Sequence, residues 1–421
     1  MEELRNRIVS YREEIQIREE ILIKRLDSLL PKLMKECDID TWIVSAREYN
    51  EDPVLMTLLP ARMLSARRRT ILVFHLKDEI SRYSLSRPGT GIDNFYEGVW
   101  RNPIDRSWGD DNYPEETQLE CLSSLIKKLN PNKIGLNVSK DIALADGLSH
   151  SEYEQITKYL PNKIVSAEKL CVRWLEERIQ EEIEMYDDIV NIAHTIIGKA
   201  FSNEVIKPGT TNHDVKFWMM DTVKKLGMEP WFDYEVSIVR EGEKTIYSES
   251  TIRNGDMLHC DVGLKYLGLC TDTQHNAFIG KIPKGIADAQ SKMNRLQDIV
   301  VGNIKLGKTG NEILKESREI AISEGLVPCI YTHPIGTHGH GAGVTIGLWD
   351  MQGGVPVKGE FTINDNTIYS LELNVMVKIP EWNNQEIMVG GETDIVVTNG
   401  EVRFVDIRQT KMYEVGEIDE L

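Results

Sequence analysis

The second half of this 421-residue chain places carboxylates inside apolar, strand-like runs, and this feature most constrains what the chain can fold into. Asp261 and Asp272 lie in two such runs, and Glu372 and Glu392 lie in two more. A buried carboxylate is costly unless it is paired or bound to a metal, and no matching set of Lys or Arg accompanies these four. We therefore expect a sheet that gathers these carboxylates around a cation.

A pair of histidines stands in the glycine-rich segment 337–343, between the second and third acidic runs. Oxygen ligands with one imidazole favour Mn²⁺, Zn²⁺, Co²⁺ or Fe²⁺. Four carboxylates and a histidine exceed what one tetrahedral zinc needs, but they suit two metals that share bridging carboxylates. His338 and His340 are two residues apart and would face the same side of a strand, so either can be the ligand.

The order of these residues resembles that of the pita-bread metallopeptidases, which include methionine aminopeptidase, aminopeptidase P and prolidase. The likeness covers roughly residues 175–421 and includes the Lys-Pro-Gly-Thr-Thr turn at 207–211. His340 fits the family's His-Gly-x-Gly pattern and is preferred over His338 on that ground. The resemblance implies two divalent metal ions, Mn²⁺ foremost with Zn²⁺, Co²⁺ or Fe²⁺ as alternatives. It implies five metal ligands: Asp261, Asp272, His340, Glu372 and Glu392.

Two histidines that are usual in this family are missing here. Where the family has one after the ligand histidine, this chain has Leu348-Trp349-Asp350. Where the family has one before the first aspartate, this chain has Glu-Lys-Thr-Ile-Tyr-Ser at 243–248. In the family these histidines bind substrate and stabilise developing charge. His333 and His338 are the candidate replacements.

The resemblance implies dimetal-dependent hydrolysis of N-terminal Xaa-Pro peptide bonds, as in aminopeptidase P, by a metal-activated hydroxide. The substrate is then a peptide with proline second. Glu372 is the candidate to accept and relay the proton, while His333 or His338 donates a hydrogen bond to the tetrahedral intermediate. These three are the candidate catalytic residues.

Two other functions stay open. Loss of one hydrogen-bond donor can cost about 10²–10³ in rate, so the chain is alternatively a weak or silent metal-binding module that binds peptides or protein partners. Hydrolysis of a non-peptide amide, as by creatinase, ranks third, because creatinase lacks the metal ligands that this chain keeps.

Near residue 170 the pattern of apolar residues changes from alternating strands and helices to a long helical stripe. This change predicts two domains. Residues 1–170 resemble the smaller N-terminal α/β domain of creatinase and prolidase, and residues 171–421 are expected to form the α/β (α+β) pita-bread catalytic domain. Apolar spacing predicts one long helix over 1–36, a second helix over 119–129, and strands at 41–44, 70–74 and 133–138. In the second domain, segments 257–264 and 269–274 are expected to pair as a hairpin that sets Asp261 across from Asp272.

Composition narrows the partners and the compartment. Lys and Arg total 49 against 67 Asp and Glu, a net charge of −18, which disfavours nucleic acid and anionic membranes as partners. No apolar run approaches the ~20 residues that span a bilayer, and the polar start has no apolar core of a secretory signal. Six cysteines without a C-x-x-C pair indicate a reducing cytoplasm. A homodimer is the expected assembly.

Overall fold

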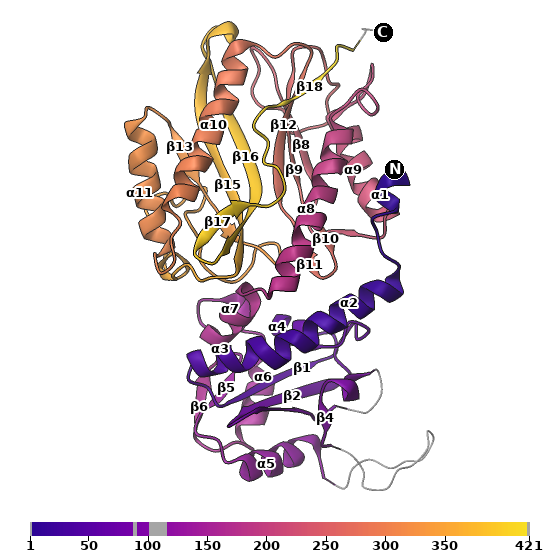
Figure 1. Cartoon of the computed structure of the whole chain (residues 1–421), viewed down its shortest axis with the longest axis vertical. Coiled ribbons are helices and arrows are strands. Elements are labelled where there is room, and N and C mark those ends of the chain that lie inside the picture. Colours follow the sequence, from indigo (N-terminus) through magenta and orange to yellow (C-terminus); the bar gives the residue numbers. More distant parts are fainter. Residues whose placement is uncertain (1, 87–90, 101–115, 419–421) are drawn as a thin grey trace. The chain divides into compact units, whose positions relative to one another are not determined.

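The computed structural model describes residues 2–86, 91–100 and 116–418 (Figure 1). The chain divides into two compact units, Ser10–Leu175 and Met1–Val9 with Glu176–Leu421. Both units mix helices with strands, which confirms the α/β (α+β) class. Among the described residues, no helix is both long and apolar enough to cross a bilayer.

The unit Ser10–Leu175 is built on a six-stranded mixed sheet in the order β4-β3-β2-β1-β5-β6. Its strands are β1 (Thr41–Arg47), β2 (Arg69–Leu76), β3 (Ile80–Ser84), β4 (Glu97–Gly98), β5 (Ile134–Leu136) and β6 (Ile164–Ser166). Its helices are α2 (Tyr11–Lys24), α3 (Leu30–Glu36), α4 (Pro53–Leu58), α5 (Gln118–Leu129), α6 (His150–Thr157) and α7 (Glu168–Glu176). Shorter helical turns are η1 (Arg25–Leu29), η2 (Ile92–Asn94) and η3 (Ala143–Ala145). The three strands and the helix predicted here are confirmed.

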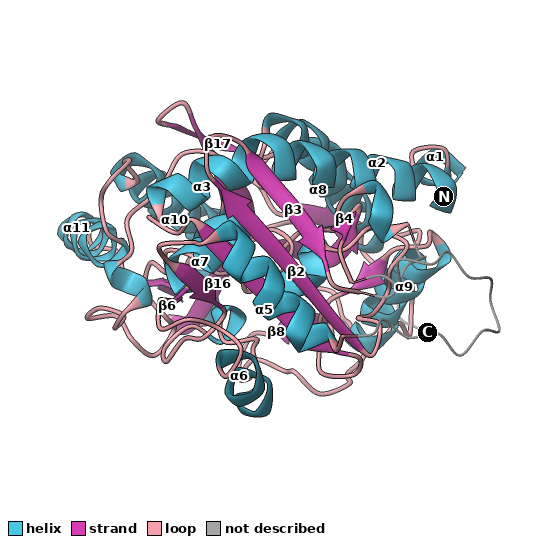
Figure 2. Cartoon of the chain, turned by 90° about the horizontal axis from the view of Figure 1, so that it is seen from below, coloured by secondary structure: helices cyan, strands magenta, loops and turns pink. Residues whose placement is uncertain are grey.

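Helix α5 covers one face of this sheet, and Figure 2 shows it running alongside β2. Its apolar side chains Leu122 and Ile126 share a buried cluster with Ile43, Ile71 and Val73 of the central strands. Successive side chains of a strand point to opposite faces, so the neighbouring buried residues of β1 and β2 face the other way. Figure 1 shows α2 and α3 on that other side.

The prediction of one long helix over residues 1–36 is wrong. The chain forms α1 (Glu2–Arg5), leaves the helix, and begins again at α2. Ser10 caps α2, because its hydroxyl accepts from Glu13 N while the Glu13 carboxylate accepts from Ser10 N. Leu4 is buried in the core of the second unit, which consists of Met1–Val9 and Glu176–Leu421. A π-helical turn, Arg25–Leu29, then precedes Pro31.

The second unit has long helices and a large sheet. Its helices after α1 are α8 (Gln180–Ala200), α9 (Asn212–Lys225), α10 (Lys284–Asn303) and α11 (Gly310–Ser323), with short turns η4 (Lys358–Glu360) and η5 (Pro380–Trp382). Its strands are β7 (Glu229–Pro230), β8 (Glu235–Val239), β9 (Met257–Val262), β10 (Leu264–Tyr266), β11 (Leu269–Cys270), β12 (Thr273–Ile279), β13 (Pro328–Ile330), β14 (His333–Pro334), β15 (Thr367–Ile379), β16 (Gln385–Thr398), β17 (Glu401–Phe404) and β18 (Tyr413–Val415). The large sheet runs β13-β15-β16-β12-β9-β8, and β14 also pairs with β15, β17 with β16 and β18 with β12.

This sheet consists of two antiparallel halves that meet at one paired position. Strands β15 and β16 pair along 13 residues from Thr367 to Ile379, and β9 pairs with β12 over six positions. Between the halves, β12 and β16 pair only at Gln274 and Glu392. Backbone pairing between strands therefore contributes little to holding the two halves together.

Helices cover one face of each half. On β9 and β12, alternate residues such as Leu258 and Ala277 pack in one apolar cluster with α8 and α9. On β15 and β16, alternate residues such as Leu371 and Ile395 pack in another cluster with α10 and α11 (Figure 1). The residues between them point away from those helices, because side chains alternate along a strand. This opposite face carries the polar side chains described next.

The expected hairpin forms, but with a different register. Val262 pairs with Thr273 and Asp261 pairs with Gln274, so Asp261 does not lie across from Asp272. The residues between them form β10 and β11, which make a separate small sheet with β7. Asp272 thus stands at the entrance to β12, one step outside the ladder.

Candidate metal centre

Four polar residues form a row across the free face of the large sheet. Glu372 of β15 pairs directly with Glu392 of β16, Glu392 pairs with Gln274 of β12, and Gln274 pairs with Asp261 of β9. Directly paired residues of neighbouring strands project to the same face, so the register itself brings the carboxylates together. Residues up to 131 positions apart in the chain meet in this way.

Two overlapping groups of side chains are spaced to hold a metal ion. Asp272, His333 and Glu392 each offer one ligand atom, and these atoms lie within 4.8 Å of one another. Asp261, Glu372 and Glu392 do the same. Glu392 belongs to both groups, so its carboxylate stands where two ions would share a ligand.

The histidine in these groups is His333, on the short strand β14, which pairs with β15. Its Nε2 lies 3.6 Å from Asp272 Oδ2 and 3.6 Å from Glu392 Oε1. Its Nδ1 lies 3.1 Å from the Pro334 carbonyl oxygen, which fixes the ring and directs Nε2 towards the carboxylates. A histidine held in this way has the arrangement of a metal ligand.

His340 and His338 belong to neither group of ligand atoms in the described part of the chain. The His340 ring packs edge-on against His333, with ring centroids 4.8 Å apart, and it is exposed. His338 is half-buried, and burial, followed by the charges of Lys265 and Arg178, lowers its pKa to about 4. The structure therefore places His340 beside His333 of the carboxylate cluster. His338 lies two residues earlier in the same loop, outside both ligand groups.

Trp231 supports the loop that carries His340. The indole Nε1 donates to the Thr271 carbonyl at 2.8 Å, and the ring packs edge-on against His340 at 5.3 Å between centroids. A side chain at Gly339 would begin only 2.4 Å from the indole ring, so glycine is required for this close approach. The backbone and Trp231 thus fix one wall beside the histidine.

Three residues absent from the predicted site hold the carboxylates in place. Gln274 Nε2 donates to Glu372 Oε1 at 2.5 Å, and Ser370 Oγ donates to Glu392 Oε1 at 2.5 Å. The Tyr186 hydroxyl of α8 lies 2.9 Å from Asp394 Oδ2, which also accepts from the backbone N–H of Asp272. Gln274 and Ser370 are polar residues inside buried strands, and this is the feature by which the sequence marks them. Tyr186 lies on the apolar face of the long helix α8, and nothing in the local sequence distinguishes it from the other residues of that face.

The electrostatics of the cluster are those of a cation site. Burial, and next the charge of Glu392, raise the pKa of Asp261, Asp272 and Glu372 well above the usual carboxyl range. Burial acts to lower the pKa of His333, but the neighbouring Glu392 outweighs it and brings the pKa to about 9. Like charges held together in a buried place favour protons or metal ions.

Unpartnered atoms show that the residues fit a metal. Asp261 Oδ1, Asp272 Oδ1, Glu392 Oε2 and His333 Nε2 are buried and have no hydrogen-bond partner. Buried polar atoms are almost always paired, so four unpartnered atoms in two ligand groups that share Glu392 call for a ligand. Among the described residues, no Lys or Arg forms an ion pair with these carboxylates. Oxygen ligands with one imidazole suit a divalent ion such as Mn²⁺.

Comparison with solved structures identifies the fold. The X-Pro aminopeptidase from Thermotoga maritima aligns over 91% of this chain and 100% of that chain, with a TM-score of 0.66 at 16% identity. The Xaa-Pro dipeptidase from Bacillus anthracis aligns over 96% of this chain and 100% of that chain, with a TM-score of 0.63 at 17% identity. At this identity the likeness establishes the fold, so the pita-bread prediction is confirmed.

Sequence comparison covers a shorter part. A protein of Mycoplasma genitalium named "Putative Xaa-Pro aminopeptidase" is 25% identical over 174 residues, which are 40% of this chain and 48% of that protein. The chain thus matches about half the length of this relative. The model of metallopeptidase family M24 matches residues 184–399, which contain all the residues of both ligand groups. The chain therefore belongs to metallopeptidase family M24.

Proposed function

We propose that this protein is a metal-dependent aminopeptidase that removes the first residue from peptides with proline in second place. The observation that carries the proposal is the set of unpartnered buried atoms of Asp261, Asp272, Glu392 and His333, residues of two ligand groups that share Glu392. The Xaa-Pro names of the structural neighbours support the substrate class.

The two groups of ligand atoms would hold two divalent ions, and Glu392 is available to both because it belongs to each group. Asp272 and His333 complete one group, and Asp261 and Glu372 complete the other. His333 takes the histidine-ligand role that the sequence pattern assigns to His340, because its Nε2 and not the His340 ring lies within the group. Mn²⁺ is the proposed metal, with Zn²⁺, Co²⁺ or Fe²⁺ as alternatives, because oxygen ligands predominate.

When bound there, divalent ions would supply Lewis acidity and lower the pKa of a water molecule towards neutrality. Glu372 takes the proton of the attacking water and passes it to the leaving proline nitrogen. The hydrogen bond from Gln274 fixes the orientation of the Glu372 carboxylate for that transfer. The acidic cluster also attracts the free ammonium of the substrate, which explains a preference for the N-terminal bond.

His340 donates a hydrogen bond to the scissile carbonyl oxygen as negative charge develops there. Its ring is exposed next to His333, so a substrate at the carboxylate cluster can reach it. Burial, and next the charge of His333, lower the pKa of His340, so it is a neutral donor at physiological pH. This role replaces one of the two accessory histidines that the chain lacks, in preference to His338.

The test is hydrolysis of short Xaa-Pro peptides by the Mn²⁺-loaded protein. Release of the first residue should disappear with chelator and in Glu372→Gln, and it should persist in Glu401→Gln, which changes an exposed glutamate of β17. If the protein binds two metals and releases no residue from any peptide, the weak or silent binding module takes the place of the enzyme.

We propose in addition that the protein is a cytoplasmic homodimer. The six cysteines are free thiols, which a reducing compartment preserves. Two-fold symmetric dimers are the commonest oligomers, and light scattering coupled to size exclusion measures the mass directly.

A further inference from the structure

The row of polar residues continues one strand beyond the proposed metal ligands. Glu235 of β8 pairs directly with Asp261 of β9, so its side chain projects from the same face as the ligands. Glu235 is exposed and belongs to neither ligand group. In the described part of the chain its carboxylate has no hydrogen bond or ion pair. A free carboxylate therefore stands next to the metal centre.

Glu235 lines a cavity of about 150 Å³ that opens directly onto Asp261. The walls combine polar groups with apolar surface, and they include Tyr247, His259, Tyr331 and Met388. Glu235 and Tyr247 line this cavity together. The carboxylate thus acts on the inside of this cavity.

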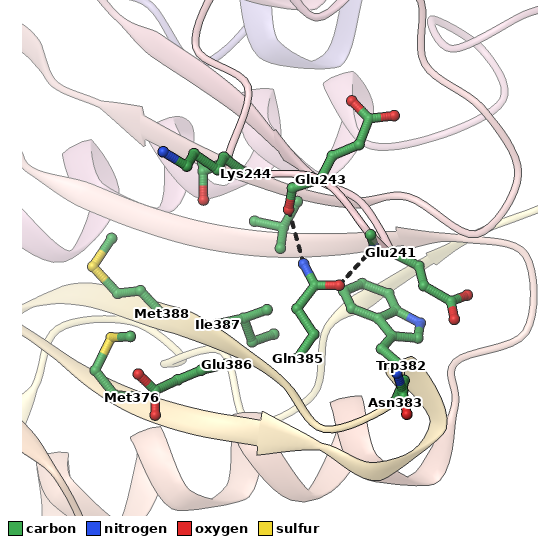
Figure 3. Close-up of a pocket in the computed structure, with 13 residues that line it drawn as sticks. Glu241, Glu243, Lys244, Met376, Trp382, Asn383, Gln385, Glu386, Ile387 and Met388 are labelled. Carbon is green, nitrogen blue, oxygen red and sulfur yellow. Dashed lines mark hydrogen bonds between the residues drawn. The ribbon is translucent and has the colours of Figure 1, made fainter.

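The small cavity adjoins a larger one of about 780 Å³, because Val239, Thr245 and Met388 line both. Figure 3 shows the larger cavity, where Met376 and Met388 lie on one side and Glu241 and Glu243 on the turn that follows β8. Its lining has three glutamates, Glu241, Glu243 and Glu386, and one lysine, Lys244. A long side chain that enters past Glu235 would therefore meet further negative charge.

Nothing in the small cavity neutralises Glu235. No Lys or Arg is among the residues that line it. In the proposed enzyme Asp261 would hold a metal ion. Aromatic rings such as Tyr247 and Tyr331 attract cations, and methionine and valine accommodate an aliphatic stem.

We propose that this cavity receives the side chain of the first substrate residue and that Glu235 selects lysine or arginine there. The inference rests on the proposed aminopeptidase function and names the substrate class of the same site. The substrate is a peptide that begins Lys-Pro or Arg-Pro. Glu235 acts on specificity, and the chemistry at Glu372 does not require it.

The experiment compares kcat/KM for Lys-Pro-Ala and Met-Pro-Ala with wild type, Glu235→Gln and Glu401→Gln. The ratio of the lysine to the methionine peptide should fall about 10-fold in Glu235→Gln and stay unchanged in Glu401→Gln. An unchanged ratio in Glu235→Gln overturns the proposal. An equal loss for both peptides also overturns it, because Glu235 then contacts the substrate ammonium.

If no peptide is hydrolysed, the proposed function fails and binding decides the further inference. Calorimetry with the Mn²⁺-loaded protein then compares the affinities for the same two peptides. Tighter binding of Lys-Pro-Ala that Glu235→Gln abolishes supports the cationic pocket, and equal affinities refute it. Because Glu235 is exposed, the variant should fold as wild type does, and its thermal midpoint checks this.

Discussion

Glu372 and Glu392 lie directly opposite each other on β15 and β16, in the middle of a 13-residue antiparallel pairing. Like charges in this position destabilise a sheet, and here each carboxylate is also removed from most of the solvent. A neighbour hydrogen-bonds to each, Gln274 to Glu372 and Ser370 to Glu392, without neutralising either charge. A divalent cation bound between the two carboxylates would therefore relieve their repulsion and stabilise the sheet.

Glu392→Gln should reduce metal binding more than any other single change, because Glu392 alone is common to both ligand groups. We expect affinity for Mn²⁺ to fall by at least about 100-fold and bound metal to approach zero. Elemental analysis after dialysis measures the metal per chain. Glu401→Gln is the matched control, and two ions retained by Glu392→Gln would contradict the assignment of Glu392 as shared ligand.

His333→Ala and His340→Ala should have different effects. His333→Ala removes an atom from a ligand group, so metal content should fall. His340→Ala should keep its metal and lose about 10²–10³-fold in kcat, the loss typical of one hydrogen-bond donor to a developing charge. Metal content and kcat measured on both variants separate the roles. If His340→Ala loses metal and His333→Ala keeps it, His340 and not His333 is the metal ligand.

Metal-free protein should lose stability as pH rises. The folded state raises the pKa of Asp261, Asp272 and Glu372, so it binds more protons than the unfolded chain above about pH 4. His333 acts in the same direction, since its contribution is complete below about pH 6.5 and is lost as pH rises through about 9. Metal competes with these protons, so the gain in Tm on adding Mn²⁺ should grow with pH. Thermal scans from pH 5 to 9, with metal and with chelator, test both slopes. A metal-free Tm that rises over this range would contradict the prediction.

Gly339→Ala should disturb Trp231 and, through it, His340. The added carbon would begin 2.4 Å from the indole ring, and overpacking of this kind costs about 1–3 kcal/mol of unfolding free energy. Urea unfolding followed by tryptophan fluorescence measures the loss. Gly353→Ala is the matched control, because a side chain there meets nothing within 4 Å. Equal stability of the two variants would show that Trp231 moves aside without cost.

Local sequence was enough for most elements and for the carboxylates. Alternation and apolar spacing predict β1, β2 and α5, and a polar residue inside a buried strand marks Glu372 and Glu392. The break before Ser10 was missed although Ser10 and Glu13 form a capping box, because the apolar spacing continues across it. The register between remote strands is not encoded locally. For this reason the sequence alone did not predict that Asp261 pairs with Gln274. Nor did it predict that His333 lies among the ligand atoms.

The narrow junction between the two halves of the large sheet gives the metal centre a mechanical consequence. Strands β12 and β16 pair only where Gln274 meets Glu392, and the ligand groups combine residues from both sides of that junction. Bound ions would therefore fasten the halves, and their removal would allow the sheet to part there before the rest of the unit unfolds. Amide hydrogens beside the junction would then exchange with solvent through a local opening, at a rate set by metal concentration and not by global stability.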